Sequence, residues 1–152
     1  WVHKTANVLN CVPKSVQPKV KDALHQIWQA DTQSNAHQAF DRFEQLFAAK
    51  YPKAMQCLQK DKDELLAFYE FPAMHWQSLR TTNPIESSFS TIRHRTKRAK
   101  GCLSRDGMLQ MMFKLGQCAE QNWRRLRGFE DLNKVITGVK FKDGMEIKQN
   151  AA

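Results

Sequence analysis

Apolar side chains recur along most of this chain at intervals of three and four residues, which is the period of an amphipathic helix. Segments with this pattern cover residues 20–28, 36–47, 55–69, 85–92 and 105–127. Pro18 and Pro52 suit the first turns of two of these helices, and Ser34 or Asn35 is the expected N-cap of the segment at 36–47. The pattern therefore predicts a mainly α protein whose apolar helix faces form a core.

The segments between these stripes predict connectors and a few short elements. Residues 60–64 alternate between lysine and acidic residues, which predicts a solvated face or a bend, and residues 71–76 read as a connector. Two long helices are expected over residues 83–97 and 105–127, with Gly101 between them and Gly128 ending the second. In the tail, residues 130–136 predict a short helix and residues 139–141 a short strand before a turn.

The charge of the chain indicates more than a generic helical domain. It predicts that the domain binds an acidic partner. The 152 residues hold 24 Lys and Arg against 15 Asp and Glu, a net charge of +9. Residues 80–127 hold 11 of the basic and 3 of the acidic residues, whereas the other 104 residues hold 13 and 12. We therefore expect one positively charged segment, and nucleic acid is the commonest partner of such a segment.

Several other classes of protein are disfavoured by the composition. The four cysteines are widely spaced and include no Cys-x-x-Cys pair, so a structural zinc site is not expected. No apolar run reaches the roughly 18 residues needed to cross a membrane, and no signal-peptide pattern is present. Because the first residue is Trp1, we expect a chain that was processed or cut from something longer.

The segment from Asn83 to Lys100 carries the candidate chemistry. Asn83 suits an N-cap, Pro84 suits the first helical position, and Glu86 then falls at the third position. This spacing matches a capping box, in which Glu86 bonds back to the backbone of Asn83, and sequence physics alone favours that interpretation. The alternative is that Glu86 is a catalytic carboxylate that holds a metal ion against a DNA phosphate.

The remainder of the same predicted helix is strongly basic. At helical spacing, four residues line one side of it next to the apolar stripe: Glu86, Ser90, Arg93 and Lys97. The positive charge extends past the predicted helix end through Arg95, Arg98 and Lys100. Cations also favour helix C-termini without any ligand, but the concentration of charge in this segment makes contact with DNA the better interpretation.

At this point the sequence resembles a known family, the Mutator-type transposases of bacterial insertion sequences. The resemblance rests on Trp76, on residues 79–87 (Leu-Arg-Thr-Thr-Asn-Pro-Ile-Glu-Ser), on Arg93-x-Arg95-Thr96 and on residues 100–105. Further matching segments are residues 1–4, residues 7–9, residues 113–115, residues 123–126 and Gly128. These segments follow one another in order over essentially the whole chain.

The resemblance implies a fold for each part of the chain. Proteins of this family carry an RNase H-like domain with an Asp, Asp, Glu metal site, and a mostly helical insertion precedes the Glu. Residues 1–4 would end the last core strand, 5–78 would form the insertion, 79–128 would hold the catalytic-Glu helix and the packing helix after it, and 129–152 would be a tail. Most of the core sheet would be missing from this chain.

The resemblance also implies a site. Glu86 would be the third ligand of a pair of Mg²⁺ or Mn²⁺ ions that serve DNA cleavage and strand transfer, and His3 and Asn83 match weaker signature positions. The residues expected to contact DNA are Arg80, Arg93, Arg95, Lys97, Arg98 and Lys100. Both catalytic aspartates would lie before Trp1, because no aspartate of this chain matches them. We therefore expect the chain alone to bind no metal cofactor and to cleave no DNA.

The partners implied by the resemblance are the transposon ends and the target DNA, together with further copies of the protein in an active homo-oligomer. No membrane is expected, and the location implied is the bacterial cytoplasm, on the nucleoid when DNA is bound. One alternative is a non-catalytic basic helical DNA-binding module or a transposon remnant. A weaker one is a helical interaction domain whose charge serves solubility, since scattered charge would serve that purpose equally well.

Overall fold

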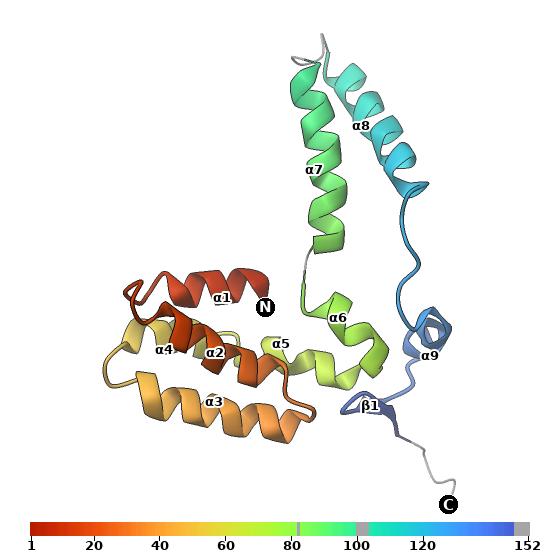
Figure 1. Cartoon of the computed structure of the whole chain (residues 1–152). Coiled ribbons are helices and arrows are strands. Elements are labelled where there is room, and N and C mark those ends of the chain that lie inside the picture. The colour runs from red at the N-terminus through yellow and green to blue at the C-terminus, as the bar shows by residue number, and fades with distance from the viewer. Residues whose placement is uncertain (82, 100–103, 148–152) are drawn as a thin grey trace, which may run out of the picture. The chain divides into compact units, whose positions relative to one another are not determined.

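The computed structural model describes residues 1–81, 83–99 and 104–147, and these residues are mainly helical. The chain divides into two compact units, shown in Figure 1. Unit 1 comprises Trp1–Thr81 and Arg127–Ala152, and unit 2 comprises Thr82–Leu126. The mainly α class predicted from the apolar periodicity is therefore confirmed.

Unit 1 contains the hydrophobic core of the described residues. Its first four helices are α1 (Val2–Leu9), α2 (Gln17–Trp28), α3 (Gln33–Phe47) and α4 (Pro52–Gln59). Helix α2 packs on α3, and α1 packs on both α2 and α4. The largest fully buried side chains are Tyr69, Phe40, Phe43, Leu24, Ile27, Leu58, Leu66, Val8 and Val20. Most of them belong to the stripes predicted at 20–28, 36–47 and 55–69, and each aliphatic or phenyl side chain contributes about 1.5–3 kcal/mol when fully buried.

Helix α1 overturns the strand expected over residues 1–4. Val8 is fully buried, the indole Nε1 of Trp1 donates to the Leu65 carbonyl at 2.8 Å, and Lys4 Nζ donates to the Cys57 carbonyl at 3.0 Å. Trp1, Lys4 and Val8 are spaced three and four residues apart. A helix places residues at this spacing on one side, where all three can contact the rest of unit 1. A strand would alternate its sides every residue and would need a paired neighbour.

The N-cap of α3 lies earlier than expected. Thr32 has extended backbone angles (φ −132°, ψ 155°), and its Oγ1 accepts a hydrogen bond from the Asn35 amide at 3.2 Å. The proposal that Ser34 or Asn35 caps this helix was therefore wrong, because Thr32 already satisfies one of the free amides of the first turn.

The bend expected near residues 60–64 is present. Helix α4 ends at Gln59, and α5 (Lys62–Leu66) and the 3₁₀ helix η1 (Ala67–Glu70) continue the chain. The connector expected at 71–76 contains a second short 3₁₀ helix, η2 (Ala73–His75), and leads into α6 (Trp76–Leu79).

The C-terminal part of unit 1 packs back on these connectors. It consists of η3 (Phe129–Asp131), α9 (Leu132–Ile136) and a hairpin of β1 (Phe141–Lys142) and β2 (Met145–Glu146), in which Phe141 pairs with Glu146. The short helix expected over 130–136 is present as α9, and the strand expected over 139–141 is shifted, because β1 overlaps it at Phe141 and includes Lys142. Gly144 (φ +81°) accepts a hydrogen bond from the Ala73 amide at 3.1 Å, and a Cβ there would lie 2.6 Å from that of Ala73. The hairpin turn therefore requires glycine.

Unit 2 consists of α7 (Asn83–Arg98) and α8 (Arg105–Glu120), which pack on each other. The helix expected over 83–97 is confirmed. Helix α8 begins where expected, with Ser104 Oγ accepting from the Gly107 amide at 3.1 Å, but it ends at Glu120 instead of residue 127. Trp123, expected to face a core, is 62% exposed. Helices are held mainly by burial of an apolar face, and the residues after Glu120 gain too little burial to continue the helix.

Gly128 was expected to end that helix and instead lies at the start of η3 with φ +68°. A Cβ there would lie 2.6 Å from the Met74 Cβ, so its glycine identity is explained by close packing within unit 1. None of the described helices is long and apolar enough to cross a bilayer.

Candidate functional site

The predicted catalytic carboxylate lies at an accessible helix start. Helix α7 begins at Asn83, and Glu86 is the acidic residue of its first turn. Both side chains are exposed, and both make interactions within the protein. A carboxylate in the first turn interacts favourably with the positive end of the helix dipole. This position is compatible with both interpretations of Glu86, the helix cap and the metal ligand.

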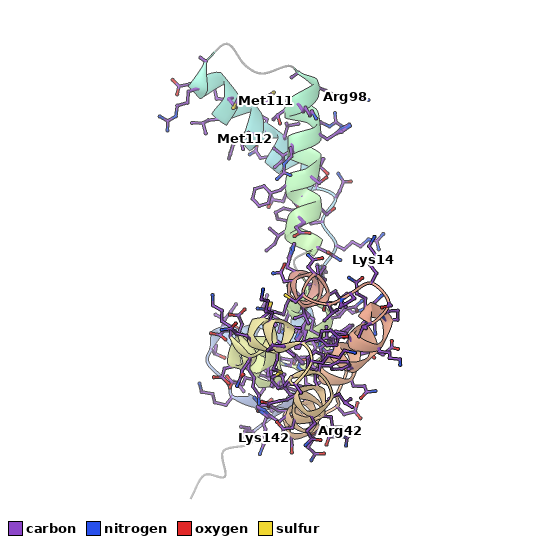
Figure 2. All side chains as sticks on the ribbon, turned by 90° about the vertical axis from the view of Figure 1, so that its left-hand side faces the viewer. Lys14, Arg42, Arg98, Met111, Met112 and Lys142 are labelled. Carbon is purple, nitrogen blue, oxygen red and sulfur yellow. The ribbon has the colours of Figure 1, made fainter. Side chains whose placement is uncertain are left out.

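The basic side of α7 has the arrangement predicted from the spacing. The helix is continuous from Asn83 to Arg98, so Glu86, Arg93 and Lys97 follow one another along one side of it. The exposed cations of the second half are Arg93, Arg95, Lys97 and Arg98, and none of them takes part in an ion pair within the described residues. Figure 2 shows Arg98 at the far end of this helix. Lys100, the last residue of the predicted surface, lies outside the described residues.

The apolar side of α7 is less buried than predicted. Ile85 is 62% exposed and Phe89 is 56% exposed, whereas Ile92 is half-buried. The expectation of a buried stripe through these three residues is therefore wrong for the first two. Within its described residues unit 2 consists of α7 and α8, and the packing of these two helices on each other leaves Ile85 and Phe89 largely exposed.

Arg80 has surroundings that sequence reasoning missed. Its guanidinium carbon lies 4.3 Å from the ring centroid of Phe68 and 5.1 Å from that of Trp76, and it also approaches Trp28 at 6.0 Å. Burial lowers the pKa of Arg80, and its Nε is buried without a hydrogen-bond partner. The residue belongs to unit 1 and is held by packing, so its contact with DNA stays a prediction.

His3 and His75 both lie in unit 1, and neither belongs to a group of metal-binding side chains among the described residues. His3 is exposed on α1, a helix and not the strand end that the resemblance implied. His75 is buried instead, and its Nε2 lies 2.9 Å from the Gly128 carbonyl. Within the described residues, no group of three or more His, Cys, Asp or Glu side chains is placed to hold a metal ion.

The sequence was compared with known proteins. Residues 1–125 match the model of the family described as Transposase, Mutator family. The transposase for insertion sequence element IST2 of Acidithiobacillus ferrooxidans is 52% identical over 145 residues, which are 95% of this chain and 49% of the relative. The transposase for IS6120 of Mycolicibacterium smegmatis is 45% identical over 149 residues, 98% of this chain and 46% of the relative.

A more distant relative is the transposase for insertion sequence element IS905 of Lactococcus lactis, 32% identical over 97 residues, which cover 64% of this chain and 25% of that protein. No solved structure matches the chain. The chain spans about half the length of the two more similar relatives. Because the family model covers most of the sequence, from Trp1 to Arg125, the chain belongs to the Mutator family of transposases.

Proposed function

We propose that this chain is the C-terminal portion of an insertion-sequence transposase and contributes the catalytic glutamate, Glu86, together with a DNA-contacting surface on α7. The observation that carries the proposal is the family match over residues 1–125, which includes both Glu86 and the basic side of α7. Because the chain spans about half of its relatives, DNA cleavage and strand transfer are proposed for a complete transposase.

In this proposal α7 and α8 pack on the sheet of an RNase H-like domain. The exposed apolar side chains of unit 2 support it: Ile85, Phe89, Leu109 and Phe113 are each more than half exposed. A sheet laid against them would remove this surface from water, at about 25 cal/mol for each Å² of apolar area. The strands of that sheet would come from residues outside this chain.

The described residues do not fit a two-metal site by themselves. Glu86 is the single acidic residue of α7, and no three-donor group forms within the described residues. Hard divalent cations take six or more oxygen ligands, so one carboxylate cannot hold a pair of them. We propose that Glu86 contributes one ligand and that the remaining carboxylates lie outside this chain. The chain alone is then expected to cleave no DNA.

The basic side of α7 would hold the DNA backbone. Arg93, Arg95, Lys97 and Arg98 are exposed and pair with no carboxylate of the described residues, so binding phosphate breaks no ion pair described there. Contacts of this kind position the duplex and carry no base information. Each one that is neutralised should lower the salt slope of DNA binding by about 1.

The first prediction tests Glu86 in a complete transposase that contains this segment. Glu86→Gln keeps the size and the hydrogen-bonding ability of the side chain but removes the charge that a metal requires. We expect strand transfer of a transposon-end duplex to be lost, while binding to the same duplex changes less than about twofold. The matched control is Glu120→Gln, which removes the exposed carboxylate of the last residue of α8 and should leave strand transfer intact.

If Glu86 is only a helix cap, a different result follows. Glu86→Gln would then cost about 0.5–2 kcal/mol of stability at most and would leave strand transfer intact, which would contradict the catalytic role. Cleavage of DNA by the purified 152-residue chain, lost in Glu86→Gln, would contradict the proposal that other carboxylates are needed.

A further inference from the structure

Unit 1 holds 15 basic and 12 acidic residues, a small net charge of +3, yet its charges are segregated along the sequence. Residues 1–21 hold four lysines and no acidic residue, and residues 45–60 hold three lysines and no acidic residue. Between these two stretches, residues 22–44 hold four acidic residues and one arginine. Because the basic and acidic stretches offset each other in the total, this separation is hidden. The net charge therefore identified only residues 80–127 as a positively charged segment.

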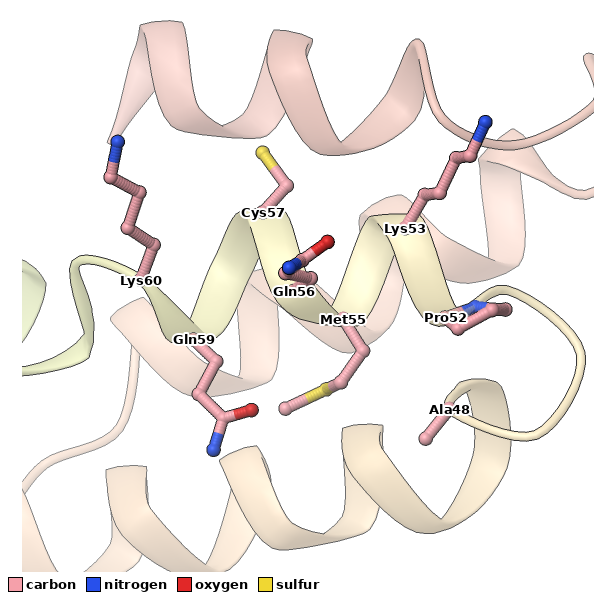
Figure 3. Close-up of a pocket in the computed structure, with 8 residues that line it drawn as sticks. All are labelled: Ala48, Pro52, Lys53, Met55, Gln56, Cys57, Gln59 and Lys60. Carbon is pink, nitrogen blue, oxygen red and sulfur yellow. The ribbon is translucent and has the colours of Figure 1, made fainter.

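The fold brings the two acid-free stretches together. Helix α1 packs against α4, and Lys4 Nζ donates to the Cys57 carbonyl of α4 at 3.0 Å. The charge of Lys4 is used within the protein, because its ammonium also pairs with Asp61. The other lysines of α4 and its flank point outward. Figure 3 shows Lys53 and Lys60 extending from the same side of α4.

We define the α4 basic face as Lys50, Lys53, Gln56 and Lys60. Positions 53, 56 and 60 share one side of the helix, and all four side chains are exposed. An open depression of about 880 Å³ lies along this helix, with Lys53, Gln56, Gln59 and Lys60 on its polar lining. No acidic side chain lines it. The face therefore offers cations and amide donors to a ligand, without any carboxylate to repel an anion.

The lysines of this face form no close ion pair within the described residues, although the Asp61 carboxylate, which pairs with Lys4, also attracts Lys60 at longer range. Neither Lys53 nor Lys60 takes part in an ion pair within the described residues, and Lys50 lies over its neighbouring Tyr51 ring at 5.7 Å. Lys134, in the charge-balanced C-terminal part of unit 1, is different: it pairs with Asp131 and with Glu146, each at 3.1 Å. Surfaces that serve solubility usually mix both signs of charge, as that region does.

We propose that the α4 basic face is a second contact for the DNA backbone, separate from the basic side of α7. The ligand is the phosphate chain of a duplex, bound without regard to sequence, because flexible lysines act as point charges and read no base edges. Lys53 and Lys60 are seven residues apart, about 10 Å along the helix, which matches the rise of about three base pairs. The inference rests on the proposed function in that the ligand is DNA.

The test uses the 152-residue chain and a duplex of arbitrary sequence, with affinity measured by fluorescence anisotropy over a series of salt concentrations. The variant Lys53→Gln/Lys60→Gln should lower the slope of log affinity against log salt by about 2. The matched control, Lys140→Gln/Lys142→Gln, removes the same charge from two exposed positions in the balanced C-terminal region and should leave the slope unchanged. Circular dichroism spectra should show equal helix content in all three proteins.

A third variant separates this inference from the proposed function. Arg93→Gln/Arg95→Gln probes the basic side of α7. If its slope falls while that of Lys53→Gln/Lys60→Gln equals the wild-type value, the α4 contact is refuted and the α7 surface stands. The reverse result refutes the α7 surface and supports α4. A chain that binds no duplex at low salt would refute both.

A second measurement needs no substitution. The accessible lysines of the wild-type chain can be acetylated with and without duplex, and the modified positions read by mass spectrometry. We expect Lys53 and Lys60 to be protected several-fold by DNA and Lys142 to react equally in both samples. Equal reactivity of Lys53 and Lys60 with and without duplex would overturn the proposed contact.

Discussion

At the scale of single residues, Arg80 shows how packing against aromatic rings changes the pKa of a polar side chain. Arg80 lies against Phe68 and Trp76 with no carboxylate partner, and burial lowers its pKa. A guanidinium tolerates such a site better than an ammonium because it is planar and more weakly hydrated. Trp76 lies one helical turn before Arg80, but Trp28 is distant in sequence, so a local pattern could not have predicted the complete set of rings.

Tyr69 in the same region gives a pH prediction. Its side chain is fully buried, its hydroxyl donates to the Ala30 carbonyl at 2.7 Å, and burial raises its pKa to about 12. Above pH 10 the unfolded chain releases the phenol proton while the folded chain keeps it. The folded state therefore binds more protons in this range, and the contribution of Tyr69 to stability falls as the pH rises from about 10 to about 12.

Tyr69→Phe should remove this contribution to the pH dependence. At neutral pH the variant should lose about 1 kcal/mol, the usual net value of one buried hydrogen bond, and the difference from wild type should shrink toward pH 12. Urea denaturation at a series of pH values measures both effects. The control is Tyr51→Phe, which changes the other tyrosine of the chain, a half-buried one. A wild-type-minus-Tyr69→Phe difference that stays constant from pH 9 to pH 12 would contradict the assignment.

At the scale of elements, the start of α3 gives a test of what fixes a helix end. Thr32 Oγ1 accepts from the Asn35 amide, whereas Ser34 lies exposed inside the first turn. Thr32→Ala should therefore destabilise unit 1 by about 1 kcal/mol, and Ser34→Ala should change stability by less than about 0.5 kcal/mol. Chemical denaturation of the two variants measures the difference. A larger loss in Ser34→Ala would restore the cap first predicted from the sequence.

In unit 1, helices α2 and α3 were predicted correctly, and both bury their apolar stripes. Val20, Leu24 and Ile27 of α2 are buried at the predicted spacing, and so are Phe40 and Phe43 of α3. The incorrect predictions concern segments whose secondary structure depends on contacts with distant parts of the chain. Helix α1 depends on contacts made with α4 and with Leu65, and α8 stops at Glu120 although its apolar periodicity continues to residue 127.

Part of the candidate site could be predicted from the sequence because it depends on a local pattern. Helical spacing placed Glu86 and the cations of α7 on a real helix, because that pattern is local. The α4 basic face was missed for a different reason. Its lysines lie close together in sequence, but the net charge of all residues outside 80–127 also includes the acidic residues of 22–44, which offset them. A sum over so long a stretch hides a short basic surface.

For the whole molecule, the described core belongs to one unit. The buried cluster lies entirely within residues 8–69, whereas α8 contains no buried residue. Amide hydrogens exchange through local opening where few apolar contacts hold a segment, and through global unfolding where the core holds it. The 152-residue chain should therefore show two levels of protection despite being helical in both units.

Hydrogen–deuterium exchange followed by mass spectrometry tests this directly. We expect peptides from α2 and α3 to be protected at least about 100-fold more strongly than peptides from α7 and α8, a difference of about 3 kcal/mol in opening free energy. The exposed apolar side chains of unit 2, including Phe89 and Phe113, give the reason. Equal protection of both helix pairs in a dilute, monomeric sample would mean that α7 and α8 are held by burial that their exposed large apolar side chains, 39–63% exposed, do not provide. That result would contradict the assignment of the described core to unit 1 alone.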